Sequence, residues 1–394
     1  MVEDGTGSRV TTTIPVARPL LDEREADAAR RVILSGWVTQ GPEVAAFEQE
    51  FAASVGAPHA CAVSSCTTAL HVALSACGVS AGDEVVTVSF SFIATANAVR
   101  YCGATPVFVD LQQDTFNIDP AGVERAIGPR TKAILVVHQF GMPCDLVAIM
   151  DIARRRGVPV VEDAACAVGS EIQWNGRWER IGRPHGLIAC FSFHPRKLLS
   201  TGDGGMLTTA DPELDRRFRL LRQHGMSVSD AVRHASSTVI KEEYPVLGFN
   251  YRMTDIQAAI GREQLKRLSD IVARRRELAA RYDAGLNYCS GVQLPREPAW
   301  ARTNWQSYTI RVERGRQPGI MQQLLDAGIA TRRGAMNAHM EGAYSPGAWR
   351  SVGSLAEGEA AQDTGIVLPL FHQLAESDQD RVIEQVRRAA GGRP

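Results

Sequence analysis

The chain has 394 residues, with 43 Lys and Arg against 44 Asp and Glu, and a formal net charge of -1. Hydrophobic residues make up 44% of it and charged residues 22%, so it can bury a large core, and a small disulfide-stapled scaffold is excluded. The balanced charge gives no field that would attract nucleic acid or an anionic membrane, so we expect neither as a partner.

The amino-terminal residues 1–18 are polar and lack the apolar run of a signal peptide, so we expect a flexible tail and a cytoplasmic protein. No run of about 18 apolar residues indicates a membrane span. The eight cysteines are scattered through apolar stretches without a C-x-x-C pair. They predict neither a zinc site nor a disulfide framework, and we expect no metal.

Helical periodicity marks residues 21–35 and 44–54. Seven short runs that are apolar without polar alternation then predict strands covered on both faces by helices, and hence a mostly parallel seven-stranded sheet of the α/β class. The last run follows a Gly pair and is a candidate for antiparallel pairing. The seven runs are 59–64, 84–89, 105–110, 133–138, 158–163, 187–193 and 205–209.

Beyond residue 211 the pattern changes. The polar stretch 227–241 is a candidate mobile flap, and a long helix is expected over residues 254–286. A strand at 306–312 and helices at 319–327 and 377–390 indicate a small α/β domain. We therefore expect a tail (1–18), a large domain (19–253), a connecting helix (254–290) and a small carboxy-terminal domain (291–394).

Open α/β sheets bind ligands beyond the carboxyl ends of their strands, and four such ends carry candidate chemistry. The hydroxyl-rich run Ser64–Leu70 opens a helix whose amino terminus suits a phosphate, although for this run taken alone a plain helix cap is the better explanation. Asp163 ends another run and would bring a carboxylate to the ligand site, although this carboxylate could also simply cap the next helix. Phe92 offers a ring for stacking, although an aromatic there is more often part of a core.

The fourth strand end leads to Lys197 and a G-D-G-G turn. Lone lysines are usually solvated, but one held against glycine backbone behind a buried strand is expected to have a pKa lowered by desolvation, as a Schiff-base former needs. A phosphate cup, an acid, a stacking ring and a lysine are together the parts that hold pyridoxal 5′-phosphate (PLP). The acid would keep the pyridine nitrogen protonated.

Several stretches strongly resemble the PLP-dependent sugar aminotransferases of the DegT/DnrJ/StrS type, which have the fold-type I aminotransferase architecture. The resemblance covers about residues 19–390. Its most specific element is S-F-x-x-x-K followed by G-D-G-G. The stretches are GWVTQGPEVAAFEQEFA, SSCTTALHVAL, SFSFIATANAV, VEDAACAVGS, CFSFHPRKLLSTGDGGML and LGFNYRMTDIQAAIGREQLKRL.

The resemblance implies a role for each matching residue. Lys197 would form the internal aldimine with the cofactor and shuttle the proton, Asp163 would face the pyridine nitrogen, and Phe92 would stack on the ring. The phosphate would be held by Thr67, Thr68 and Ser192. The family's G-x-N-x-R motif implies that Asn250 reaches the phosphate of a neighbouring subunit, so a homodimer is expected.

Two departures from the family pattern concern substrate and cofactor. Cys166 stands where the family commonly has Gln or His, and a thiol donates a much weaker hydrogen bond toward the cofactor. The segment that often ends in a substrate-facing His is here A-T-R-R-G-A-M-N-A-H. Arg332, His339 and also His224 are therefore candidates for substrate binding, although the arginines could equally be solvated.

These implications predict an aminotransferase that takes an amino group from glutamate or glutamine, holds it as pyridoxamine phosphate, and passes it to a nucleotide-linked keto-sugar. A cyclitol or another small keto substrate is the alternative acceptor. Sugar dehydratases of this family replace the lysine with histidine, so Lys197 disfavours dehydration. A non-catalytic regulatory protein with an aminotransferase-like body is the alternative from another class.

Overall fold

The computed structural model describes residues 13–228, 233 and 236–391. Its centre is an eight-stranded sheet in which β10 runs antiparallel to both of its neighbours, while all other neighbours are parallel. The antiparallel pairing of the seventh run is thereby confirmed. In order across the sheet the strands are β1 (His59–Val63), β10 (Gly205–Thr209), β9 (Ile188–Ser192), β6 (Val160–Asp163), β5 (Thr131–Val137), β2 (Glu84–Val88), β4 (Thr105–Val109) and β16 (Arg350–Ser351).

The expectation of seven strands needs one correction. The eighth, β16, has two residues and pairs with β4 from the carboxy-terminal part of the chain. A run this short has no periodicity to detect, so only its tertiary pairing reveals it.

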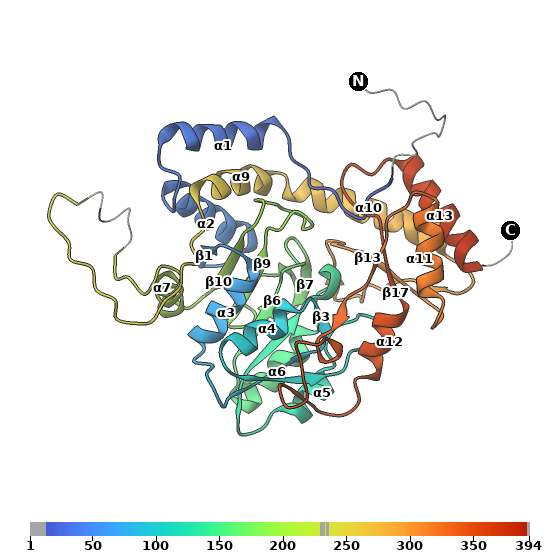
Figure 1. Ribbon diagram of the computed structural model, residues 1–394, viewed down its shortest axis with the longest axis horizontal. Coiled ribbons are helices and arrows are strands. Elements are labelled where there is room, and N and C mark those ends of the chain that lie inside the picture. The colour runs from blue at the N-terminus through green and yellow to red at the C-terminus, as the bar shows by residue number, and fades with distance from the viewer. Residues whose placement is uncertain (1–12, 229–232, 234–235, 392–394) are drawn as a thin grey trace.

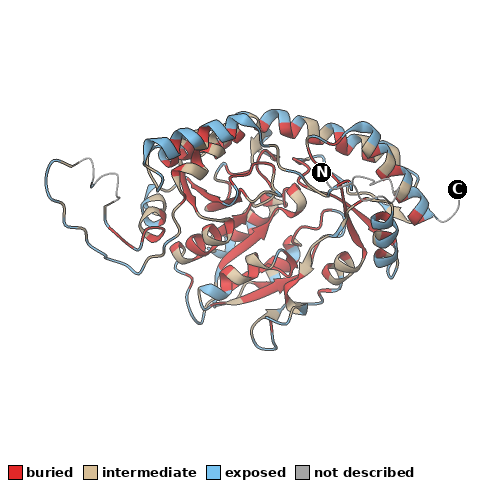
Figure 2. Cartoon of the chain, turned by 45° about the horizontal axis from the view of Figure 1, so that its top comes forward, coloured by how far each residue is buried: buried red, intermediate tan, exposed pale blue. Residues whose placement is uncertain are grey.

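Helices cover both faces of this sheet (Figure 1). All residues of β2, β9 and β10 are buried, as the unbroken apolar runs require, and Figure 2 shows the exposed residues gathered on the outer faces of the helices. The helices of this part are α1 (Glu23–Ser35), α2 (Pro42–Val55), α3 (Cys66–Ala76), α4 (Ala94–Tyr101), α5 (Pro120–Ala126), α6 (Leu146–Arg156) and α7 (Pro212–Leu221).

The single long helix expected over residues 254–286 is instead two helices, α9 (Asp255–Lys266) and α10 (Leu268–Leu286). At the junction the Arg267 N–H bonds to the carbonyl of Gln264, three residues back, which tightens the last turn and ends α9. The Arg267 side chain forms an ion pair at 2.8 Å with Asp22, the N-cap of α1. α10 runs on toward the carboxy-terminal part (Figure 1).

The carboxy-terminal part has its own four-stranded sheet and a second hydrophobic core, to which α10 contributes Leu278 and Tyr282. The small α/β unit has the elements expected for it and several more. Its sheet is β11 (Val292–Gln293), β13 (Tyr308–Val312), β17 (Gly365–Leu368) and β14 (Arg332–Arg333), with helices α11 (Gln317–Asp326), α12 (Ala356–Thr364) and α13 (Glu376–Gly391). Two minor sheets each pair a carboxy-terminal strand with strands from earlier in the chain. One consists of β12 (Ala301–Arg302), β7 (Glu171–Trp174) and β8 (Arg177–Arg180), and the other of β15 (Met336–Asn337) and β3 (Phe90–Ser91).

The expected flexible tail is corrected at its inner end. Residues 1–12 lie outside the described residues, but Ile14 is only 4% exposed and belongs to the second core. Its N–H bonds to the carbonyl of Gly328, and its carbonyl accepts from Ala330. These backbone bonds anchor the segment after residue 13 to the carboxy-terminal part.

The candidate flap 227–241 falls partly outside the described residues, at 229–232 and 234–235. Its other residues belong to a loop that projects from the body beside α7 (Figure 1), and its mobility stays a prediction. Among the described residues, no helix has the length and apolar character needed to cross a membrane. Nor do those residues bring together a cluster of side chains suited to a metal ion.

Candidate active site

A cavity of about 300 Å³ opens at the carboxyl ends of β6 and β9, between the first turn of α3 and the strands β14 and β17. This is the edge at which an open α/β sheet is expected to bind its ligand. It gathers seven of the candidate residues, namely Thr67, Phe92, Asp163, Cys166, Ser192, Lys197 and Arg332.

Asp163, the last residue of β6, is only 5% exposed. Its carboxylate accepts a 2.7 Å hydrogen bond from the Thr95 hydroxyl and a 3.1 Å bond from the N–H of Ala165. Burial raises the pKa of Asp163, while these hydrogen bonds and the positive charge of Lys197 oppose that rise. A buried, fixed acid of this kind suits a cationic ligand group.

The neighbouring Glu162 is fully buried and pairs with Nε2 of His138 at 3.0 Å. Because Nδ1 of His138 accepts from the N–H of Cys144, Nε2 carries the proton and donates it toward the glutamate. Consecutive strand residues face opposite sides of the sheet, so this pair supports the core rather than the cavity. His138 is thus structural.

Lys197 follows β9 in a turn closed by the bond of its N–H to the His194 carbonyl. Its Nζ lies 3.0 Å from Sγ of Cys166. Burial lowers the pKa of Lys197, but Cys166, Cys66 and Asp163 raise it more, so the net direction is upward. The expected lowered pKa is therefore wrong for this cavity, because desolvation is outweighed by acidic groups around the amine.

The glycine-rich turn brings β10 against the start of α3. A Cβ on Gly205 would lie 2.4 Å from the Ser65 carbonyl oxygen, so this close approach requires glycine. Ser65 caps α3 by accepting from the N–H of Thr68, whose hydroxyl accepts in turn from the N–H of Ser65. Thr68 thus serves the capping box and lies outside the cavity lining, whereas Thr67 lines it.

The first turn of α3 suits a phosphate, because its N–H groups cannot all pair within the helix and carry partial positive charge. Ser192 lies across from it at the end of β9 and also lines the cavity. Phe92 presents a large apolar ring that is 57% exposed at the same cavity. An exposed ring of this kind suits stacking on a flat ligand.

Besides Thr68, three candidates lie outside the lining of this cavity: His339, His224 and Asn250. His339 bonds through Nδ1 to the Ser89 hydroxyl at 2.7 Å, and its Nε2 lies 3.3 Å from Glu359. His224 is exposed at a positive φ of 63°. The structure therefore brings neither histidine to the cavity of its own chain.

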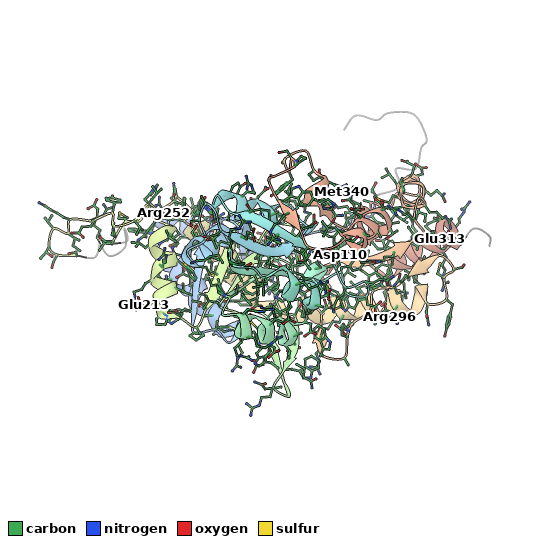
Figure 3. The ribbon with its side chains drawn as sticks, turned by 90° about the horizontal axis from the view of Figure 1, so that it is seen from below. Asp110, Glu213, Arg252, Arg296, Glu313 and Met340 are labelled. Atoms are coloured by element: carbon green, nitrogen blue, oxygen red, sulfur yellow. The ribbon has the colours of Figure 1, made fainter. Side chains whose placement is uncertain are left out.

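Asn250 is exposed and pairs by a backbone bridge with Gln223, just after α7. Figure 3 places the nearby Arg252 at the same end of the molecule as Glu213 of α7. The Asn250 side chain thus stands at the surface, outside the cavity lining of its own chain.

Sequence reasoning missed Thr95, Arg196 and Gln306, which all line the cavity. Thr95 sits in the first turn of α4, so its position just after the candidate Phe92 was an available signal. Arg196 directly precedes Lys197. Gln306 comes from the carboxy-terminal half of the chain, and only tertiary structure places it here.

The donor set fits PLP: an amine for its aldehyde, a buried acid for its ring nitrogen, and a helix amino terminus for its phosphate. The class so defined is a PLP-binding α/β enzyme. More particularly, the chain belongs to the DegT/DnrJ/EryC1/StrS aminotransferase family, whose model matches residues 19–387. It is an aminotransferase, and its cofactor is pyridoxal phosphate.

Individual relatives extend over nearly the whole chain. The spore coat polysaccharide biosynthesis protein SpsC of Bacillus subtilis (strain 168) is 38% identical over 384 residues, which is 96% of this chain and 97% of SpsC. The aminotransferase TlmJ from Streptoalloteichus hindustanus has a similar structure, with a TM-score of 0.87, 38% identity, and coverage of 96% and 98%. Spr1654 of Streptococcus pneumoniae, solved in its PMP form, gives a TM-score of 0.89 at 27% identity and covers 96% of this chain and 99% of its own.

Proposed function

We propose that this enzyme moves an amino group from glutamate or glutamine to a nucleotide-linked keto-sugar. The observation that carries the proposal is the shared cavity of Lys197 and Asp163, which supplies both the amine and the acid that transamination needs. The kinship with SpsC, named for polysaccharide biosynthesis, favours a sugar as acceptor.

The bound cofactor would carry the amino group between the two substrates. Its ring would accept the electron pair that is left on the substrate carbon when that carbon loses its proton. Asp163 would hold a proton on the ring nitrogen through its negative charge. Thr95 and the N–H of Ala165 fix both of its oxygens, so the carboxylate is already oriented before a ligand arrives.

Lys197 Nζ would take the proton from Cα of the amino donor and return it to the sugar carbon, acting as base and acid in turn. The sulfur of Cys166, 3.0 Å away, accepts a hydrogen bond from this amine and so helps to hold it in position. Thr67, Ser192 and the α3 amino terminus would hold the phosphate. Asn250, exposed beside α7, would reach the cavity of a second copy, so the working unit would be a homodimer.

The proposal is tested by incubating the purified holoenzyme with a panel of amino donors and nucleotide keto-sugars while its cofactor absorbance is followed. Glutamate or glutamine should change the absorbance, and a nucleotide keto-sugar should restore it. A response to a donor that is reversed only by a cyclitol or a small keto acid would replace the proposed acceptor.

A further inference from the structure

Two exposed arginines, Arg196 and Arg332, stand at the mouth of the cavity. Arg196 lies in the turn after β9 and Arg332 in β14, and both line the cavity. Within the described part of the chain, neither guanidinium makes an ion pair, although Asp203 lines the same cavity. Unpaired arginines facing a cavity are suited to an anionic ligand.

The two guanidinium groups lie close enough to influence each other. Burial lowers the pKa of Arg332, and the positive charges of Arg196 and Arg333 lower it further. Burial also lowers the pKa of His194, and the charges of Arg196, Lys197 and Arg332 lower it further, while Asp203 opposes them. The mouth of the cavity is therefore a positively charged region, and a bound anion would relieve its internal repulsion.

The backbone of Arg196 is fixed from both sides. Its carbonyl accepts a 2.6 Å hydrogen bond from Nε2 of Gln306, a side chain only 8% exposed. Its N–H donates to Nδ1 of His194 at 3.2 Å. The base of the Arg196 side chain is thus held in place, which lowers the entropic cost of binding a ligand there.

The neighbouring Arg333 is in a different situation. It shares the strand with Arg332 and also lines the cavity, but its Nη2 lies 3.3 Å from Glu341. Successive residues of a strand point to opposite faces, so the two arginines diverge. Arg333 therefore provides a matched control: the same residue type in the same strand, but with a carboxylate partner of its own.

We propose that Arg196 and Arg332 together form a subsite for an oxyanion of a substrate, either the carboxylate of the amino donor or the diphosphate of the acceptor. The proposal rests on the proposed function for the identity of these substrates. Because Arg196 directly precedes Lys197, an anion bound between the two arginines would anchor a substrate beside the reacting amine. Arginine binds carboxylate and phosphate through the same two-pronged geometry, so both sources share one chemistry.

The test measures equilibrium binding of two unreactive ligands, glutarate and uridine diphosphate, to the holoenzyme by calorimetry. Arg196→Gln and Arg332→Gln should each weaken at least one of these ligands about tenfold, because each removes a charge-assisted contact. Arg333→Gln should change either affinity less than about twofold. Loss of glutarate binding alone assigns the subsite to the donor, and loss of uridine diphosphate binding alone assigns it to the acceptor.

The subsite is overturned if both ligands bind the two variants as tightly as the wild type, if wild type binds neither, or if Arg333→Gln is equally damaging. Unchanged cofactor absorbance in each variant shows that the fold and cofactor site are intact. Arg196→Lys and Arg332→Lys should restore part of the affinity, since they keep the charge and lose only the planar fork. Failure of the wild-type enzyme to aminate any keto-sugar would contradict the proposed function instead. The glutarate measurement would still test the arginine subsite in that case.

Discussion

The Thr95 hydroxyl donates a 2.7 Å hydrogen bond to Oδ2 of Asp163, and it lies 2.9 Å from the Ser91 hydroxyl. Thr95 is itself buried. The segment that carries the stacking candidate Phe92 is therefore tied directly to the acid at the end of β6. Ring stacking and ring protonation depend on one connected piece of structure.

Thr95→Val keeps the shape of the side chain and removes this hydrogen bond. We expect about a tenfold loss of cofactor affinity or of the rate with the amino donor, because Asp163 loses a fixed donor while remaining buried. Fluorescence titration of cofactor and stopped-flow absorbance measure the two quantities. Thr95→Ser keeps the hydroxyl and should stay near wild type; an equal loss in both variants would show that the methyl packing matters instead.

Cys166→Ala removes the largest contribution that raises the pKa of Lys197. The pKa of the amine should fall in the cofactor-free protein, so more of it is neutral at pH 8 and acetic anhydride should label Lys197 faster. Mass spectrometry of the labelled peptide across a pH series measures this. Cys144→Ala, at a buried cysteine outside the cavity lining, is the control. Identical labelling profiles in wild type and Cys166→Ala would contradict the coupling.

Asp163 gives a prediction on pH. Because burial raises its pKa above the ordinary value for an aspartate, the folded cofactor-free chain binds more protons than the unfolded chain as the pH falls toward that raised pKa. Its contribution to stability must therefore rise as the pH falls. The free energy of unfolding of wild type, relative to Asp163→Asn, should increase from pH 7 to pH 5. Denaturant unfolding at several pH values measures it, and a decrease would reverse the assigned direction.

Asp255 is a structural residue outside the active site, and it tests the packing of α2 on α9. Its carboxylate accepts from the N–H groups of Gly41, Glu43 and Val44, at 2.7, 3.2 and 3.0 Å, and so caps α2 from another helix. Asp255→Ala should lower the free energy of unfolding by about 2 kcal/mol, the upper range for a lost cap.

The exposed Asp270 in the first turn of α10 is the matched control, and Asp270→Ala should change stability by less than about 0.5 kcal/mol. Thermal and denaturant unfolding of both variants decide the point. Equal effects of the two substitutions would remove the special role of Asp255.

Much of the fold was predictable because its signals are local. Seven apolar runs are enough to indicate a doubly covered sheet; Asp163 ends one of these runs, and Lys197 lies in the turn that follows another. What stayed hidden depends on contacts between distant segments. Arg267, at the break between α9 and α10, pairs with the distant Asp22, the backbone of Ile14 bonds to Gly328, and β16 has only two residues.

The same division holds in the site. Thr67 and Phe92 sit at strand ends, where a ligand is expected, and both line the cavity. Gln306 contacts Arg196, and Arg196 shares the cavity with Arg332, in both cases across more than 100 residues of sequence. No local sequence pattern can predict such contacts. The direction of the Lys197 pKa also depends on such contacts, since the acids around the amine come from two other parts of the chain, at residue 66 and at residues 163–166.

The most direct test of the account is reduction of the native holoenzyme with borohydride, followed by peptide mapping. The cofactor should be fixed to the peptide that contains Lys197, and Lys197→Ala should yield a folded protein with no fixed cofactor and no amino transfer. Recovery of the cofactor on Lys132, Lys241 or Lys266 in the wild type would contradict the central claim.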